Sequence, residues 1–226
     1  MKFLNKKAIL FDLDGTLINS SPDLALAINH MLTKLGRETF STDTIHYWVG
    51  NGAEMLVKRA LSGQREVDPA LDQHLVQEAL PIFFESYSQN LVRDTYPYPH
   101  VPSTLQALRQ HGYRLAIVTN KPSRFVQPIL QALELDSYFE YHLGGDSLLE
   151  KKPNPLPLLH ICQELGIEVK ESVMVGDSRN DILAAKACEM QSIGLTYGYN
   201  YGEDIATYHP EMVVDHFEDI LSSLIH

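Results

Sequence analysis

The chain has 226 residues, of which 44% are hydrophobic and 21% are charged, and its formal net charge is −11 at pH 7. This length fits one domain, or one domain that carries a smaller insertion, and the composition excludes a disordered protein. The acidic balance argues against nucleic acid as a partner, because phosphate backbones bind clustered Lys and Arg side chains.

The beginning of the chain and its cysteines indicate the compartment. Residues 1–7 are basic, but the apolar run that follows them soon reaches Asp12. That run is too short for a signal peptide or for a membrane helix, which needs about 18 apolar residues. Cys162 and Cys188 have no CxxC spacing, so we predict two reduced thiols in the core. These features predict a cytoplasmic protein without membrane contact, and they leave its oligomeric state open.

Short apolar runs predict the strands. The first is Ala8-Ile9-Leu10-Phe11, followed by a turn-like Asp14-Gly15-Thr16, and further runs lie at 115–118, 173–175 and 192–195. Each is typical of a strand that is buried on both faces, as in a parallel sheet. Helical patterns separate the later runs, at 102–111, at 154–165 and from residue 181 onward. This alternation predicts an α/β fold with a Rossmann-like open parallel sheet.

Residues 20–90 interrupt the alternation. Ser21-Pro22-Asp23 has the composition of a helix start, and further helical stretches follow at 52–61 and 69–90 without any strand-like pattern between them. The proline-rich segment 96–102 is a stiff connection typical of a domain boundary. We therefore expect a core of residues 1–19 and 91–226, with a helical cap of residues 20–90 inserted after the first strand.

Polar side chains follow the predicted strands, and ligands of open α/β sheets bind beyond the carboxyl ends of the strands. We expect one edge of the sheet to collect side chains from four separate segments. They are Asp12 and Asp14, Thr119 and Asn120, Lys152, and Asp177 with Asp181.

These residues resemble the four motifs of the haloacid dehalogenase superfamily in order and in type. The segments are Asp12-Leu13-Asp14-Gly15-Thr16, Thr119, Lys152-Pro153, and Gly176-Asp177 with Asp181. The similarity covers essentially the whole chain, and the helical insertion stands where that superfamily has its first cap. Residues 48–52, 176–181 and 194–200 resemble bacterial phosphoglycolate phosphatases in particular. The resemblance implies hydrolysis of a small phosphorylated organic acid, 2-phosphoglycolate, to glycolate and phosphate.

The resemblance also implies a nucleophile and a metal. Asp12 is the expected nucleophile, because a carboxylate divides ester hydrolysis into making and breaking an acyl phosphate. A hard divalent cation, Mg²⁺, is expected to cancel the repulsion between this carboxylate and the phosphate. Its expected ligands are the Asp12 carboxylate, the Asp14 main-chain carbonyl and the Asp177 carboxylate.

The remaining motif residues have expected roles around the phosphate. Asp14 lies two residues past Asp12, so its side chain points the same way in an extended chain and can transfer the leaving-group proton. Family members that cleave carbon–halogen bonds lack this second carboxylate, so it favours phosphoryl transfer. Lys152 is expected to face the phosphoryl group, with Lys151 as the alternative, while Thr119 and Asn120 bind substrate. Asp181 is expected to orient Lys152 or a metal-bound water.

The cap offers a candidate anion site. Gly50-Asn51-Gly52 precedes a helix, whose free amide groups and dipole favour an anion such as the substrate carboxylate. The alternative is that the two glycines only make the turn between helices. Lys58 and Arg59 follow on that helix, and we expect their charges to be solvated. The alternative is that one of them reaches the substrate.

Other functions remain open at this point. A β-phosphoglucomutase-like sugar-phosphate mutase shares the core and the style of cap, and another small phosphate ester is an alternative substrate. A non-catalytic binding protein is the third alternative, and the carboxylates and the lysine of the motifs argue against it.

Overall fold

The structure, a computed structural model, describes residues 3–225, so Met1 and Lys2 of the basic N-terminal segment and His226 lie outside it. Its centre is a six-stranded sheet in the order β5-β4-β1-β6-β7-β8, and every neighbouring pair is parallel. The strands are β1 (Ala8–Phe11), β4 (Arg114–Val118), β5 (Tyr141–Leu143), β6 (Ser172–Gly176), β7 (Gln191–Leu195) and β8 (Met212–Val214). The predicted α/β fold with a Rossmann-like parallel sheet is confirmed.

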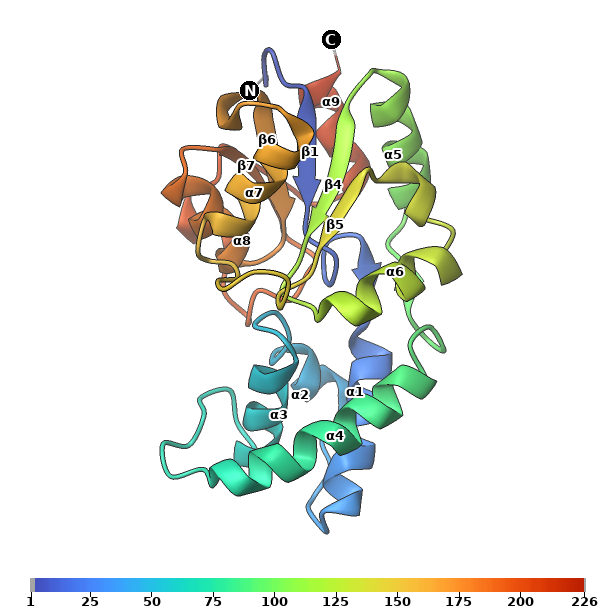
Figure 1. Cartoon of the computed structure of the whole chain (residues 1–226), viewed down its shortest axis with the longest axis vertical. Coiled ribbons are helices and arrows are strands. Elements are labelled where there is room, and N and C mark those ends of the chain that lie inside the picture. Colours follow the sequence, from blue (N-terminus) through green and yellow to red (C-terminus); the bar gives the residue numbers. More distant parts are fainter. Residues whose placement is uncertain (1–2, 226) are drawn as a thin grey trace.

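Helices cover both faces of this sheet (Figure 1). They are α5 (Val101–Gln110), α6 (Ser123–Ala132), α7 (Leu156–Leu165), α8 (Arg179–Ala187) and the short α9 (Leu221–Leu224). Alternate residues of β1 belong to two separate cores. Ile9 and Phe11 pack with α5 and α6, whereas Ala8 and Leu10 pack with α7 and α8. The strand is therefore buried on both faces, which explains its continuous apolar run.

Four helices gather beyond the end of the sheet toward which β1 points, separate from the helices that flank the sheet (Figure 1). They are α1 (Ser21–Lys34), α2 (Thr42–His46), α3 (Ala53–Ser62) and α4 (Gln73–Gln89). The two connections to the sheet lie side by side, because β2 (Ile18–Asn19) pairs with β3 (Tyr96–Pro97). The Asp23 carboxylate adds to this tie by accepting hydrogen bonds from the backbone amides of residues 93–95.

Several element bounds differ from the predicted ones. The helix expected from residue 69 begins at Gln73, because the Asp72 carboxylate accepts a hydrogen bond from His74 N and caps it there. The segment 96–102, expected to be a connection up to a helix from residue 102, contains β3, and α5 begins one residue earlier, at Val101. The short β5 and β8, at the two edges of the sheet, were not predicted.

The state of the two cysteines and the character of the helices follow from the structure. Both Cys162 and Cys188 are free thiols, as predicted, with Cys162 buried against the sheet and Cys188 half-buried. Across residues 3–225, no helix combines the length and the apolar character that crossing a membrane requires.

Candidate active site

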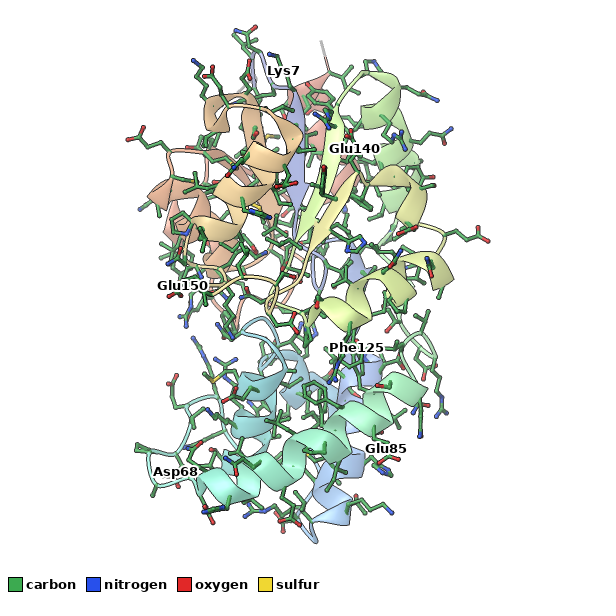
Figure 2. The ribbon with its side chains drawn as sticks, viewed as in Figure 1. Lys7, Asp68, Glu85, Phe125, Glu140 and Glu150 are labelled. Carbon is green, nitrogen blue, oxygen red and sulfur yellow. The ribbon has the colours of Figure 1, made fainter. Side chains whose placement is uncertain are left out.

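The polar strand ends open onto a cavity of about 40 Å³ between the sheet and the four-helix group. The sheet side contributes Asp12, Asp14 and Thr119, and the helical side contributes Gly50, Gly52 and Tyr87. Phe125 of α6 closes part of the wall, at the point where Figure 2 places it between the sheet and α4. Its ring contacts that of Tyr87, with the two centroids 5.1 Å apart.

Three buried carboxylates meet beside this cavity. Oxygens of Asp12, Asp177 and Asp181 lie within 4.8 Å of one another. Lys152 is only 2% exposed, and its Nζ lies 3.0 Å from Asp12 Oδ1 and 2.6 Å from Asp181 Oδ1. The neighbouring Lys151 is exposed and donates instead to the Asn51 carbonyl, 2.8 Å away. The structure thus brings Lys152, and not Lys151, to the carboxylates.

Glycines allow the backbone to approach Asp177 closely. A Cβ atom at Gly198 would lie 2.2 Å from this side chain, and one at Gly15, where φ is +89°, would lie 2.4 Å from it. Two hydrogen bonds then orient the carboxylate, from Thr16 Oγ1 to Oδ1 at 2.6 Å and from Tyr199 N to Oδ2 at 2.7 Å. The Asp-Gly-Thr turn after β1 and the loop after β7 therefore both position Asp177.

The electrostatics of the cluster favour a bound cation. Burial raises the pKa of Asp12 to about 6, with further contributions from Asp181 and Asp14 that Lys152 opposes. Burial, Asp12 and Asp181 also raise the pKa of Asp177 well above its usual range. Three carboxylates face one ammonium group, so two negative charges are left without a counterion when all three are ionised.

The donor set fits a hard divalent cation, which prefers oxygen ligands. Asp12 Oδ1 is buried and, within residues 3–225, takes part in no hydrogen bond of ordinary geometry. Each Asp177 oxygen accepts one hydrogen bond and keeps a free lone pair. Asp181 is engaged more fully, because Oδ1 accepts from Lys152 and Oδ2 from Ser178 N and Oγ. Asp12 and Asp177 are therefore the better ligands, and Asp181 orients Lys152 and caps α8.

Asp14 has a partner outside the predicted site residues. Lys121 Nζ lies 2.9 Å from Asp14 Oδ1 and 3.0 Å from Oδ2, and the lysine side chain is 3% exposed. Burial lowers the pKa of the Lys121 ammonium, but Asp14 and Tyr87 outweigh burial and leave that pKa raised. The only sequence signal was the position of Lys121 two residues after Thr119, at the end of β4.

Thr119 and Asn120 lie at the same strand end but have different environments. Thr119 lines the cavity, and its Oγ1 accepts a hydrogen bond from Lys121 N at 3.2 Å. Asn120 donates from Nδ2 to the Gly50 carbonyl at 3.1 Å and to the Lys152 carbonyl at 2.9 Å. The Asn120 amide thus links the helical group to the Lys152 loop, and only its buried Oδ1 remains without a partner in the described chain.

In the loop at residues 50–52, the two glycines face the cavity and the Asn51 side chain faces Arg59. Gly50 and Gly52 line the cavity, with φ of +119° and +87°, while the Asn51 side chain accepts from Arg59 Nη2 at 2.9 Å. The expected solvation of Arg59 is wrong. Arg59 is 6% exposed. Its guanidinium also donates a hydrogen bond to the Trp48 carbonyl at 2.6 Å, so it binds two oxygens of the turn between α2 and α3. Lys58 is half-buried and pairs with Glu54.

The comparisons with known proteins agree with this arrangement. Residues 9–195 match the family model "Haloacid dehalogenase-like hydrolase". The chain is 52% identical over 99% of both chains to a phosphoglycolate phosphatase of Colwellia psychrerythraea. It is 48% identical to a protein of the same name from Psychrobacter arcticus, over 98% of this chain and 97% of that one.

A solved structure is similar over nearly the whole length. The crystal structure of a predicted phosphoglycolate phosphatase from Haemophilus somnus 129pt has a TM-score of 0.90 and 43% identity, over 96% of this chain and 97% of that one. With the family model covering most of the residues, the protein belongs to the haloacid dehalogenase-like hydrolases.

Proposed function

We propose that the protein hydrolyses 2-phosphoglycolate to glycolate and phosphate through an aspartyl-phosphate intermediate on Asp12, with Mg²⁺ as its metal. The observation that carries this proposal is the meeting of two kinds of carboxylate on one small cavity. Asp12 lies among Asp177, Asp181 and Lys152, whereas Asp14 lies beside Lys121. The choice of substrate is supported by the names of the relatives and by the size of the cavity.

The proposed reaction uses the two carboxylates in turn. Asp12 attacks phosphorus, the bond from phosphorus to the ester oxygen breaks, and Asp14 gives the leaving oxygen a proton. Asp14 then takes a proton from the water that attacks the aspartyl phosphate, so that Asp12 and Asp14 return to their starting states. Asp14 lines the same cavity as Asp12, so both carboxylates can reach one bound substrate, as the two roles require.

The other groups compensate charge. Asp12, Asp177 and the Asp14 carbonyl would hold Mg²⁺, which would supply positive charge to offset the negative charge of the phosphate. Lys152 adds a fixed ammonium group, and Asp181 holds that group in place. Thr119 donates its hydroxyl to the phosphate.

The cavity size argues for a small acid over a sugar. Its volume is about 40 Å³, and one buried water needs on the order of 10–15 Å³ of such space. A glycolate unit suits this cavity better than a hexose ring, which would extend into the larger adjoining space lined by Gly52, Asn120 and Lys151.

Two further parts of the proposal concern the protein as a whole. Residues 20–90 act as a cap that opens for substrate entry and closes to exclude bulk water, with hinges at the two paired connections, near 17–20 and 91–99. The cytoplasm is the proposed location, in keeping with the two free thiols.

A substrate panel tests the reaction. With Mg²⁺ present, phosphate release is measured from 2-phosphoglycolate, β-glucose 1-phosphate, a nucleoside monophosphate and pyrophosphate. We expect kcat/KM to be highest for 2-phosphoglycolate, because its small glycolate leaving group suits the cavity, and we expect EDTA to abolish turnover.

The panel also separates the alternatives. A higher kcat/KM for another ester would contradict 2-phosphoglycolate as the substrate but would leave the proposed phosphatase reaction on Asp12 in place. Isomerisation of a sugar phosphate without phosphate release, with a long-lived phospho-aspartate, would establish the mutase instead. If no ester is hydrolysed, the proposal that the protein is an enzyme is wrong.

The pKa of Asp12 predicts that activity falls at low pH and that the pH of this fall depends on the Mg²⁺ concentration. At low Mg²⁺ concentration, kcat/KM for 2-phosphoglycolate should fall as the pH falls through about 6, because a protonated Asp12 cannot attack phosphorus. Saturating Mg²⁺ should move this fall to lower pH, because the cation and the proton compete for the same carboxylate. Profiles at two metal concentrations test this, and a fall that does not move would contradict binding at Asp12.

A further inference from the structure

A buried lysine lines the cavity without an assigned role in the reaction. Two of the three N–H groups of an ammonium suffice for the two contacts of Lys121 with Asp14, which leaves one donor free. Its Nζ also lies 4.9 Å from the centroid of the Tyr87 ring, inside the same cavity. Lys121 is therefore a fixed positive charge that can hold an anion beside Asp14.

Tyr87 brings a second donor from the helical side. The residue belongs to α4 and is 1% exposed, yet nothing among residues 3–225 makes a hydrogen bond of ordinary geometry with its hydroxyl, Lys121 included. Burial raises the pKa of Tyr87 to about 12, so the hydroxyl keeps its proton at neutral pH. A buried donor without a partner, at the wall of a cavity, points to a ligand that accepts from it.

The start of α3 reaches the same cavity. Gly52 precedes this 10-residue helix, and both Gly52 and Ala53 line the cavity. The first hydrogen bond within the helix runs from Leu56 N to the Gly52 carbonyl, so the amides of residues 53–55 have no acceptor inside the helix. Such amides and the helix dipole favour an anion.

The rest of the wall is apolar and includes Leu24, Leu56 and Phe83. Charge interactions are stronger in such surroundings than in water. An ammonium, a hydroxyl and a helix start thus supply donors to a cavity whose size suits a carboxylate.

We propose that Lys121, Tyr87 and the first amides of α3 bind the carboxylate of the substrate and make the enzyme select phosphate esters that carry an acid group close to the ester oxygen. This specificity site rests on the proposed function. It leaves Asp12 and Asp14 their roles and assigns the discrimination between acidic and neutral esters to residues outside the four motifs.

The test compares two esters of equal chain length. Ethyl phosphate replaces the carboxylate of 2-phosphoglycolate by a methyl group, and the selectivity is the ratio of kcat/KM for the two substrates. We expect this ratio to fall by about 10- to 100-fold in Lys121→Met and by about 10-fold in Tyr87→Phe, because each loses a charge-assisted hydrogen bond. The ratio cancels any loss that both substrates share, such as a disturbed Asp14.

Further measurements distinguish binding of the substrate carboxylate by Lys121 from an effect of Lys121 on Asp14. For 2-phosphoglycolate, the loss should appear mainly in KM, and inhibition by glycolate should weaken in both variants. Equal losses of kcat on both esters, with the ratio unchanged, would show that Lys121 serves Asp14 alone and would overturn the proposal. Lys186→Met and Tyr141→Phe, at exposed positions on α8 and β5, are matched controls expected to keep the ratio.

Folding of the variants is checked by thermal melting. If Lys121→Met does not fold, the test rests on Tyr87→Phe, which removes a single oxygen atom. A lower kcat/KM ratio in this variant supports the specificity site, and an unchanged ratio overturns it. A wild-type protein with no preference for 2-phosphoglycolate would reject the proposed substrate itself. A preference that survives in the folded variants would reject the specificity site and leave the proposed function intact.

Discussion

Replacing Asp12 by Asn is expected to abolish phosphate release from 2-phosphoglycolate while leaving the protein folded. The loss in kcat should reach at least about 10⁴-fold, because an amide cannot form the acyl phosphate and loss of a nucleophile removes the whole covalent route. Phosphate release and the incorporation of labelled phosphate into the protein should disappear together. Turnover close to that of the wild type would contradict the role of Asp12 as nucleophile.

The same substitution is expected to stabilise the protein in the absence of metal. Burial raises the pKa of Asp12 to about 6 in the folded chain, above its ordinary value of 3.8. The folded state therefore binds more protons than the unfolded state between these pH values, so stability falls as the pH rises through this window and stays lowered above it. Asn removes this penalty, because it carries no charge beside Asp177 and Asp181.

Urea unfolding in EDTA measures this second effect. The variant should be more stable than the wild type above pH 6, and the difference should vanish near pH 4. Asp68→Asn is the matched control, since Asp68 is exposed at the end of the helical group far from the sheet (Figure 2). It should change neither the activity nor the pH dependence of stability.

Replacing Lys152 by Met is expected to lower both activity and stability. Loss of one electrostatic stabiliser of the transferring phosphoryl group typically costs about 10²–10³-fold in kcat. The substitution also leaves Asp12 and Asp181 buried without their common cation, and breaking a buried ion pair costs about 3–5 kcal/mol of the free energy of unfolding. Steady-state kinetics and urea unfolding measure the two effects.

The neighbouring residue supplies the control for Lys152. Lys151→Met removes an exposed lysine one position earlier, and such a change usually alters stability by less than about 0.5 kcal/mol. Added Mg²⁺ should recover part of the stability of Lys152→Met, because the cation binds beside the same carboxylates. Equal stability losses in the two variants would show that the ion pairs of Lys152 contribute nothing measurable.

Local patterns in the sequence were sufficient for the architecture. The runs at β1, β4 and β6 are apolar without interruption because these strands are covered on both faces, and that feature is visible in each segment alone. The edge strands β5 and β8 are three residues each and partly exposed. Their formation depends on pairing with β4 and β7, which no local pattern reports.

The motif residues were also accessible from the sequence. Strand ends of a parallel sheet meet at one edge, so the positions of Asp12, Thr119 and Asp177 along the chain already predict that they converge. The structure brings these residues together with Asp14, Lys152 and Asp181 around the cavity and the acidic cluster.

The sequence by itself determined the fold class, the family and the group of residues at the sheet edge, because the short apolar runs and the order of the motifs can be read along the chain. Only the tertiary structure decided which charges are buried and what they face. Lys121 meets Asp14 across 107 positions, Arg59 turns inward to the Trp48 carbonyl, and the Tyr87 hydroxyl lies at the cavity without a hydrogen bond from the described residues. Lysine and arginine are mostly exposed and tyrosine is intermediate, so residue type alone does not predict these buried positions, and burial depends on how the helices close over the sheet.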